Sequence, residues 1–228
     1  MLRLFLFLFP MLLAAQVYSL SFYGIAIGEV IMDSGPDALR FSARSEGLLN
    51  MIWPFQNDYK TRFDPGTYTV REYMKTIRQK EKDFTLSCTW DDNGIYTWSK
   101  GDTLRRPQGM ENIFSMLARI QQVNASDIDT RWYILDHEGQ CVRARFLWAN
   151  TVRVFVRNDS ILCDYYRLDL EILPRGRKIS EEQDYFMKYI SERDLIRQIW
   201  VEREEPRRII KALVSRGPLK LEALLQNE

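Results

Sequence analysis

Short segments in which apolar and polar residues alternate recur from residue 18 to the end of the chain. They are rich in Val, Ile, Tyr, Phe and Thr and are separated by turn residues, which is typical of antiparallel strands. The expected strands cover residues 18–33, 39–45, 59–63, 67–77, 84–90, 95–99, 195–201, 207–214 and 219–225. Residues 92–94 read as a three-residue hairpin loop, because Gly94 supplies the left-handed residue that such a loop needs last. In that register Trp90 faces Tyr96 and Cys88 faces Trp98, and Cys88 is expected to be a small buried hydrophobe.

Residues 131–172 are predicted to form a four-stranded meander with turns at 138–139, at 149–150 and near Asp159. With these turns one face is apolar and the other polar, and a one-residue slip would invert a strand. The pairs on the apolar face are Leu135 with Val142, Tyr133 with Ala144, Trp148 with Val152, Phe146 with Val154, Val156 with Leu162 and Val152 with Tyr166. The polar face receives Arg143, Arg145, Arg153, Arg157, Arg167, Asp169 and Glu171. Asp164 is the exception, since it falls on the apolar face.

The meander also bears on the cysteines. Cys141 and Cys163 fall on its polar face, on strands separated by a third strand. Their expected separation is about twice the strand spacing of ~4.8 Å, which exceeds the Cα separation of about 7 Å that a disulfide tolerates. No bond between these two residues is expected.

One segment has the apolar spacing of a helix. Ile113, Met116, Leu117 and Ile120 recur at intervals of three and four within residues 110–121. Residues 180–190 begin with a capping-box pattern at Ser180 but are rich in aromatic residues, so both helix and strand stay open there. These elements predict a mainly β fold, a curved antiparallel sheet or half-barrel with one covering helix.

The N-terminus has the plan of a secretory signal peptide. Arg3 precedes an apolar run at residues 4–13, and the small residues Ala14 and Ala15 follow. We therefore expect a signal peptide at 1–15 and a single β-rich domain at 16–228. The alternatives are a retained anchor whose span extends to Leu20, or a buried first strand.

Composition and motifs exclude several functional classes. The net charge is +1, from 32 basic and 31 acidic residues, so no nucleic-acid partner is expected. The three cysteines include no CxxC pair, and His137, the one histidine, lies in a predicted tight turn where it is expected to be solvated. Nucleophile-elbow, zinc-protease, phosphate-loop and dinucleotide patterns are absent from the sequence. We expect no enzyme activity and predict no catalytic, cofactor or metal residues.

Two residue groups have competing interpretations. The arginines of the polar face fit either an anion-binding or lipid-headgroup surface, or a solvated face neutralised by Asp169 and Glu171. Trp53, Phe55 and Tyr59 fit either the lining of an apolar ligand cleft or the closed end of a core.

The order of segments resembles the bacterial family called domain of unknown function 3108. The resemblance rests on YSLSFYGIAIGEV at 18–30, on FDPGTYTVREYMKTIRQKEKDFTLSCTW at 63–90, on the helix MENIFSMLARIQ at 110–121, and on IRQIWVEREEPRRIIKALVSRGPLKLEALL at 196–225. The helix departs from the family pattern, which usually opens with Asp where Glu111 and Asn112 stand here. The resemblance implies an exported envelope protein with a curved antiparallel sheet similar to the half-barrel of outer-membrane lipoprotein carriers. It implies no catalytic residue.

Three functional hypotheses follow. The first is a non-enzymatic periplasmic protein that holds an apolar or lipid-like ligand on its curved sheet. The second is a structural or assembly partner at the outer membrane that acts through contacts with another envelope protein. The third, a hydrolase of envelope polymer, needs carboxylates that converge in a cleft. A large apolar cavity favours the first hypothesis, and a filled core with an exposed apolar patch favours the second.

The signal-peptide pattern gives a direct prediction. Residues 1 to about 15 should be removed on export, because an apolar run followed by small residues is what signal peptidase cleaves. N-terminal sequencing of the protein isolated from the cell envelope should therefore not detect Met1. Recovery of Met1 together with carbonate-resistant membrane association would support the anchor instead.

Overall fold

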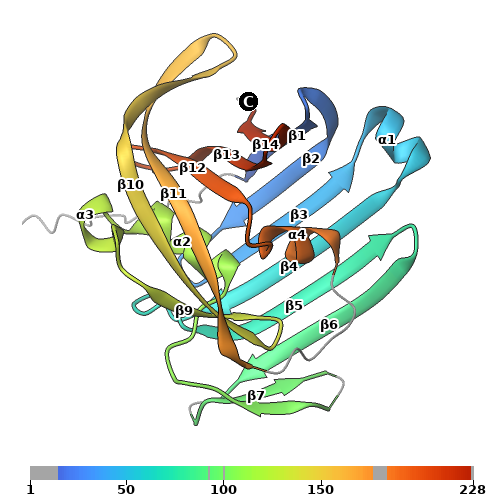
Figure 1. The fold of residues 1–228 in the computed structure, drawn as a ribbon, viewed down its shortest axis with the longest axis vertical. Helices are drawn as coiled ribbons and strands as arrows, with labels where there is room; N and C mark the ends of the chain where they lie inside the picture. Colours follow the sequence, from blue (N-terminus) through green and yellow to red (C-terminus); the bar gives the residue numbers. More distant parts are fainter. Residues whose placement is uncertain (1–14, 92, 100, 177–183, 227–228) are drawn as a thin grey trace, which may run out of the picture.

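The computed structural model describes residues 15–91, 93–99, 101–176 and 184–226, and these form one large antiparallel sheet that curls around a helix (Figure 1). The strand order is β8-β7-β6-β5-β4-β3-β2-β1-β14-β13-β12-β11-β10-β9, so the first and last strands are neighbours in the middle of the sheet. The strands are β1 (Gln16–Phe22), β2 (Ile25–Ser34), β3 (Ala38–Ser45), β4 (Phe55–Phe63), β5 (Val70–Gln79), β6 (Lys82–Trp90), β7 (Ile95–Trp98), β8 (Thr103–Arg105), β9 (Tyr133–His137), β10 (Gln140–Val156), β11 (Asp159–Gly176), β12 (Ile196–Glu202), β13 (Ile209–Arg216) and β14 (Leu219–Leu225). The mainly β fold predicted from the pattern is confirmed.

Four helices accompany the sheet in the part of the chain that the structure describes. They are α1 (Gly47–Ile52), α2 (Ile113–Gln122), α3 (Ala125–Ile128) and α4 (Tyr185–Ile190). The predicted helix at 110–121 is confirmed as α2, but it begins later because Asn112 caps it: the Ser115 amide donates to Asn112 Oδ1 at 2.9 Å, and the Asn112 amide donates to Ser115 Oγ at 3.0 Å. The predicted helix-or-strand segment at 180–190 contains α4, whose N-cap is Asp184. The capping-box start at Ser180 lies outside the described residues.

The segment before α2 draws two distant parts of the sheet together. The Val70 amide of β5 donates to the Met110 carbonyl at 3.0 Å. On the other side the Glu111 amide donates to the Ile134 carbonyl at 3.0 Å, and the Asp136 amide donates to the Glu111 carbonyl at 2.8 Å. This segment therefore joins β5 to the edge strand β9, so the sheet encloses α2 almost as a barrel does.

Several predicted registers are confirmed. Trp90 pairs with Tyr96 and Cys88 with Trp98 across a turn in which Gly94 has φ +75°. Leu135 pairs with Val142 and Tyr133 with Ala144 in the β9–β10 hairpin. Cys88 is buried, as its alternation predicted.

The four-stranded meander is wrong in its second half. Residues 149–150 are not a turn: β10 continues to Val156 and takes up the extra residue as a bulge between Trp148 and Asn150. Trp148 consequently pairs with Tyr166 rather than with Val152, and it is 45% exposed instead of inward. Val156 pairs with Asp159 rather than with Leu162, because the real hairpin turn is at 157–158.

The bulge also explains the error at the cysteines. Across it the inward positions of β11 change from Tyr166 and Leu168 to Cys163, which pairs with Val152 and is buried rather than on the polar face. Cys141 is buried as well, beside Asp136 in the enclosed β9–β10 hairpin. The strands that carry Cys141 and Cys163 are direct neighbours. Val152 is eleven residues beyond Cys141 on β10, roughly 36 Å of strand, so the two thiols are far outside disulfide range.

Phe146 provides a test of the packing around β10. Its side chain is fully buried and lies edge to face with Tyr166, with ring centroids 6.1 Å apart. Phe146→Ala should lower the free energy of unfolding by about 3–5 kcal/mol, whereas Arg153→Ala, at an exposed position of the same strand, should change it by less than about 0.5 kcal/mol. Urea melts of both variants measure the difference, and equal midpoint shifts would contradict the inward face assigned here.

Candidate functional site

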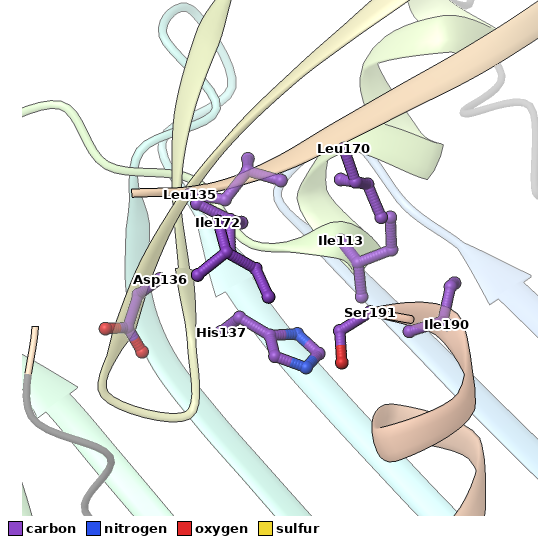
Figure 2. Close-up of a pocket in the computed structure, with 9 residues that line it drawn as sticks. Ile113, Leu135, Asp136, His137, Leu170, Ile172, Ile190 and Ser191 are labelled. Atoms are coloured by element: carbon purple, nitrogen blue, oxygen red, sulfur yellow. The ribbon is translucent and has the colours of Figure 1, made fainter. Parts of the chain in front are cut away.

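The space inside the curled sheet is filled with side chains. Most of α2 is buried, including Phe114, Met116 and Ile120. The two cavities described in this interior each hold about 10 Å³, which is room for about one water molecule. Figure 2 shows the first cavity, where the His137 ring faces Ile113 of α2 and Ile190 at the end of α4.

A charged cluster is buried beside these cavities. Lys75 lies on the inward face of β5 between Tyr73 and Ile77, where period-two alternation places an apolar residue. Its Nζ donates to Glu138 Oε1 and, at 3.0 Å, to Asp184 Oδ2. The three side chains are at most 1% exposed, so this is a fully desolvated ion triad. It connects β5, the β9–β10 turn and the start of α4.

Two tyrosines and a main-chain group complete the cluster. The hydroxyl of Tyr59 donates to Asp184 Oδ1 at 2.8 Å, and that of Tyr73 donates to Glu138 Oε1 at 3.4 Å. The Met187 amide donates to Asp184 Oδ1 at 2.9 Å, so Asp184 caps α4 and anchors it to the sheet at the same time. Among the described residues no group hydrogen-bonds to Glu138 Oε2, and Glu138 and Trp90 both line the second cavity.

Burial controls the protonation of these groups. Desolvation raises the pKa of Glu138 to about 7, and the opposing charge of Lys75 does not offset it. Desolvation lowers the pKa of His137 to about 4, so this imidazole is neutral at physiological pH. Its Nε2 lies 3.0 Å from the Met187 carbonyl oxygen and donates to it in the neutral tautomer that this contact requires.

The prediction that His137 is solvated is wrong. The turn at 138–139 exists, with φ +53° at Glu138 and φ +89° at Gly139, but it folds under α4 instead of pointing into water. A local turn pattern does not reveal whether another element covers the turn. Lys75 was detectable in principle, as a charge at an apolar position of an alternating strand, whereas nothing near Asp184 marks its partner.

The arginines of the predicted polar face follow the solvated interpretation where they face β11. Arg143 pairs with Glu171, while Arg145 and Arg167 both pair with Asp169, at 3.0 and 2.9 Å. The remaining two, Arg153 and Arg157, lie further along the hairpin and are exposed. Neutralised side chains of this kind leave little attraction for an anion.

Trp53, Phe55 and Tyr59 do not line a common cleft. Tyr59 is buried in the ion cluster, while Trp53 and Phe55 are half-buried. The Trp53 ring lies edge to face with Tyr185 of α4, with centroids 5.7 Å apart. This contact brings α1 and α4 together at one end of the sheet.

Exposed apolar side chains gather at that same end. Of the fifteen large apolar side chains that are exposed among the described residues, nine lie in the connections that meet there or at the strand ends next to them. We call them the apolar rim: Phe22, Tyr23, Ile25, Leu48, Met51, Ile52, Tyr185, Ile196 and Leu219. Figure 1 shows α1 and the turn between β5 and β6 at the right-hand end of the sheet.

Direct contacts join the connections of the apolar rim. The Tyr23 amide donates to the Lys220 carbonyl at 3.1 Å, which links the β1–β2 and β13–β14 turns. Arg216 at the latter turn pairs with Glu192 at 3.1 Å and with Asp194 at 3.4 Å, in the linker between α4 and β12. The Glu46 amide donates to the Ile27 carbonyl at 3.0 Å and holds the start of α1 beside β2. The separate parts of the chain that carry the rim residues are therefore held together at one end of the sheet.

Among the described residues no group of three or more His, Cys, Asp or Glu side chains has the arrangement to hold a metal ion. In the same part of the chain no helix has both the length and the apolar character to cross a membrane.

Comparison with known proteins shows the fold and no family. No family model matches the chain, and no curated protein matches it. The chain is similar to the solved structure of a β-barrel-like protein of domain of unknown function 1849 from Brucella abortus, with a TM-score of 0.60 and 8% identity over 92% of this chain and 94% of that one. A protein of the 1089 family from Pseudomonas aeruginosa aligns with a TM-score of 0.38 and 12% identity, over 84% of this chain and 88% of that one. The likeness to a β-barrel-like domain of unknown function agrees with the predicted fold, while membership of family 3108 is not shown.

The raised pKa of Glu138 predicts a pH dependence of stability. Between about pH 4.5, the ordinary value, and about pH 7 the folded state binds more protons than the unfolded state, so Glu138 lowers stability as the pH rises. Glu138→Gln should remove this loss, which is on the order of 1–3 kcal/mol. The measurement is the free energy of unfolding of wild type and variant at intervals from pH 5 to 7.5.

His137 makes the opposite contribution, because its lowered pKa adds stability as the pH rises from about 4 to 6.5. This contribution is common to wild type and Glu138→Gln, so it cancels in the difference between their free energies of unfolding. Glu81→Gln, at an exposed carboxyl in the β5–β6 turn, is the matched control and should leave the profile unchanged. Parallel profiles for wild type and Glu138→Gln would show that Glu138 does not retain its proton in the folded state.

Proposed function

We propose that this chain is a non-enzymatic protein of the bacterial cell envelope that docks an apolar partner through its apolar rim. The observation that carries the proposal is the combination of a filled interior with exposed apolar side chains that gather at one end of the sheet. Apolar side chains that gather on a protein surface mark an interaction site, because their exposure to water is costly. The envelope location rests on the signal-peptide pattern at residues 1–15.

The surface supports this function better than the interior does. A lipid-like ligand needs a cavity of several hundred Å³, whereas the two cavities described each hold about 10 Å³. Side chains of α2 occupy the place on the concave face where a ligand was expected. The filled interior therefore favours the second of the sequence hypotheses, an assembly or docking partner.

The buried reactive groups support a role without chemistry. Lys75 is enclosed by its two carboxylate partners, and His137 is held neutral beneath α4. Burial raises the pKa of the thiols of Cys88, Cys141 and Cys163, which disfavours the nucleophilic thiolate. A catalytic group has to meet its substrate, and all of these side chains are buried.

Binding of bis-ANS, a fluorescent apolar probe, tests the proposal. Met51 is 82% exposed in α1, so Met51→Asp should leave the fold intact while it places a charge in the middle of the apolar rim. Probe fluorescence should fall in this variant. Phe155→Asp is the matched control, since Phe155 is 73% exposed on the β10–β11 hairpin and lies outside the rim.

Equal losses in both variants would contradict docking through the rim. A fatty-acid probe that binds one to one and is unaffected by Met51→Asp would favour the interior ligand instead.

A further inference from the structure

The side chains of the apolar rim are strongly exposed. Its most exposed members are Ile25 at 70%, Leu48 at 77%, Met51 at 82% and Ile52 at 69%. Three of them belong to α1, a helix in which no residue is buried. Apolar side chains that are exposed to this degree can enter the boundary between lipid headgroups and acyl chains, where an apolar face becomes buried.

Two lysines contact aromatic rings next to these exposed side chains. Lys80 Nζ lies 5.6 Å from the centroid of the Trp53 ring, and Lys82 Nζ lies 5.4 Å from that of Tyr185. Rings with a polar edge and lysines with a long apolar stem are the side chains that favour the boundary between lipid headgroups and acyl chains.

The charges around the rim leave basic groups available. Glu192 and Asp194 are both paired with Arg216. Likewise, Glu29 and Glu46 are both paired with Arg44.

Three exposed lysines lie in the β5–β6 turn, in α4 and at the start of β14. Lys80, Lys188 and Lys220 form no ion pair with any residue that the structure describes. Glu81 and Asp83, beside Lys80 in the chain, are exposed acids that partly offset them. Ammonium groups next to exposed apolar side chains match the phosphates of lipid headgroups.

We infer that the apolar rim docks on the surface of a lipid bilayer, with the side chains of α1 and of the β1–β2 turn at the headgroup boundary. The inference rests on the proposed function and names its partner. In this orientation one end of the sheet contacts the membrane, and the tip of the β10–β11 hairpin points away from the membrane. The strand pairing supports this orientation. Ile196 of the rim begins β12, and Glu202 at the other end of β12 pairs with Cys163 of β11. Phe155 pairs with Ser160, three residues further along β11, so it lies at the end of the sheet opposite to the rim.

A reporter at a single position tests the inference on the full chain. Met51→Cys and Phe155→Cys are each labelled with the environment-sensitive dye NBD, and the buried native cysteines leave the introduced thiol as the accessible one. Vesicles of phosphatidylethanolamine and phosphatidylglycerol are then added. The dye at position 51 should brighten and shift to the blue, and the dye at 155 should not. Both proteins carry the same apolar N-terminal residues, so this segment cannot produce the difference.

Vesicle co-sedimentation gives the second measurement. Met51→Asp should weaken partitioning by about tenfold, the effect of losing one buried apolar side chain, and Phe155→Asp should not weaken it. Equal responses at positions 51 and 155 would mean unspecific adsorption and overturn the inference. No response at 51, in a protein whose rim still binds bis-ANS, would overturn the lipid partner and leave a protein partner. Binding of bis-ANS that does not depend on Met51 would instead overturn the proposed function itself.

Discussion

The whole structure depends on how a single sheet covers its own apolar face. A flat sheet of this length would leave that face in water, and one ten-residue helix cannot shield it. The sheet instead curls until α2 lies inside it, and the Met110–Glu111 segment bonds to β5 on one side and β9 on the other. Every other feature follows from that closure, including the filled interior, the enclosed β9–β10 turn and the end that remains available for contacts.

The buried ion triad also helps to close the sheet, because it joins β5 to the β9–β10 turn and to the start of α4. Lys75 meets two carboxylates, and each carboxylate comes from a segment that would otherwise have little reason to enter the core. Buried ion pairs add little net stability, since desolvation offsets most of their attraction, but they tolerate few alternative arrangements. The triad therefore specifies where the turn and α4 must sit more than it strengthens the fold.

The sequence predicted the features that depend on local pattern. The final hairpin, the Gly94 turn and α2 follow from alternation, turn chemistry and helical spacing, and they are found within a few residues of their expected places. The bulge after Trp148 could not be predicted, because an Ala-Asn pair fits a tight turn and a bulge equally well and the choice depends on the neighbouring strands.

The candidate site was harder to predict than the fold. The Glu138 and Asp184 carboxylates are far from Lys75 in sequence, and the residues of the apolar rim are scattered over several connections, each unremarkable alone. The fold brings them together: the triad joins three separate segments, and the antiparallel strand order places the connections of the rim at one end of the sheet. Neither arrangement leaves a local mark in the sequence.

The position of the two chain ends has a consequence for how the protein is made. β1 pairs with β14, and Tyr18 lies opposite Leu225, so the middle of the sheet is built from the first and the last strands of the chain. The runs β1 to β8 and β9 to β14 each form by pairing neighbours in sequence, but they merge only when the final strand is present. Contacts of such long sequence separation form slowly. A chain that emerges N-terminus first therefore cannot complete this sheet until β14 has followed, which leaves the sheet incomplete while the chain is being synthesised.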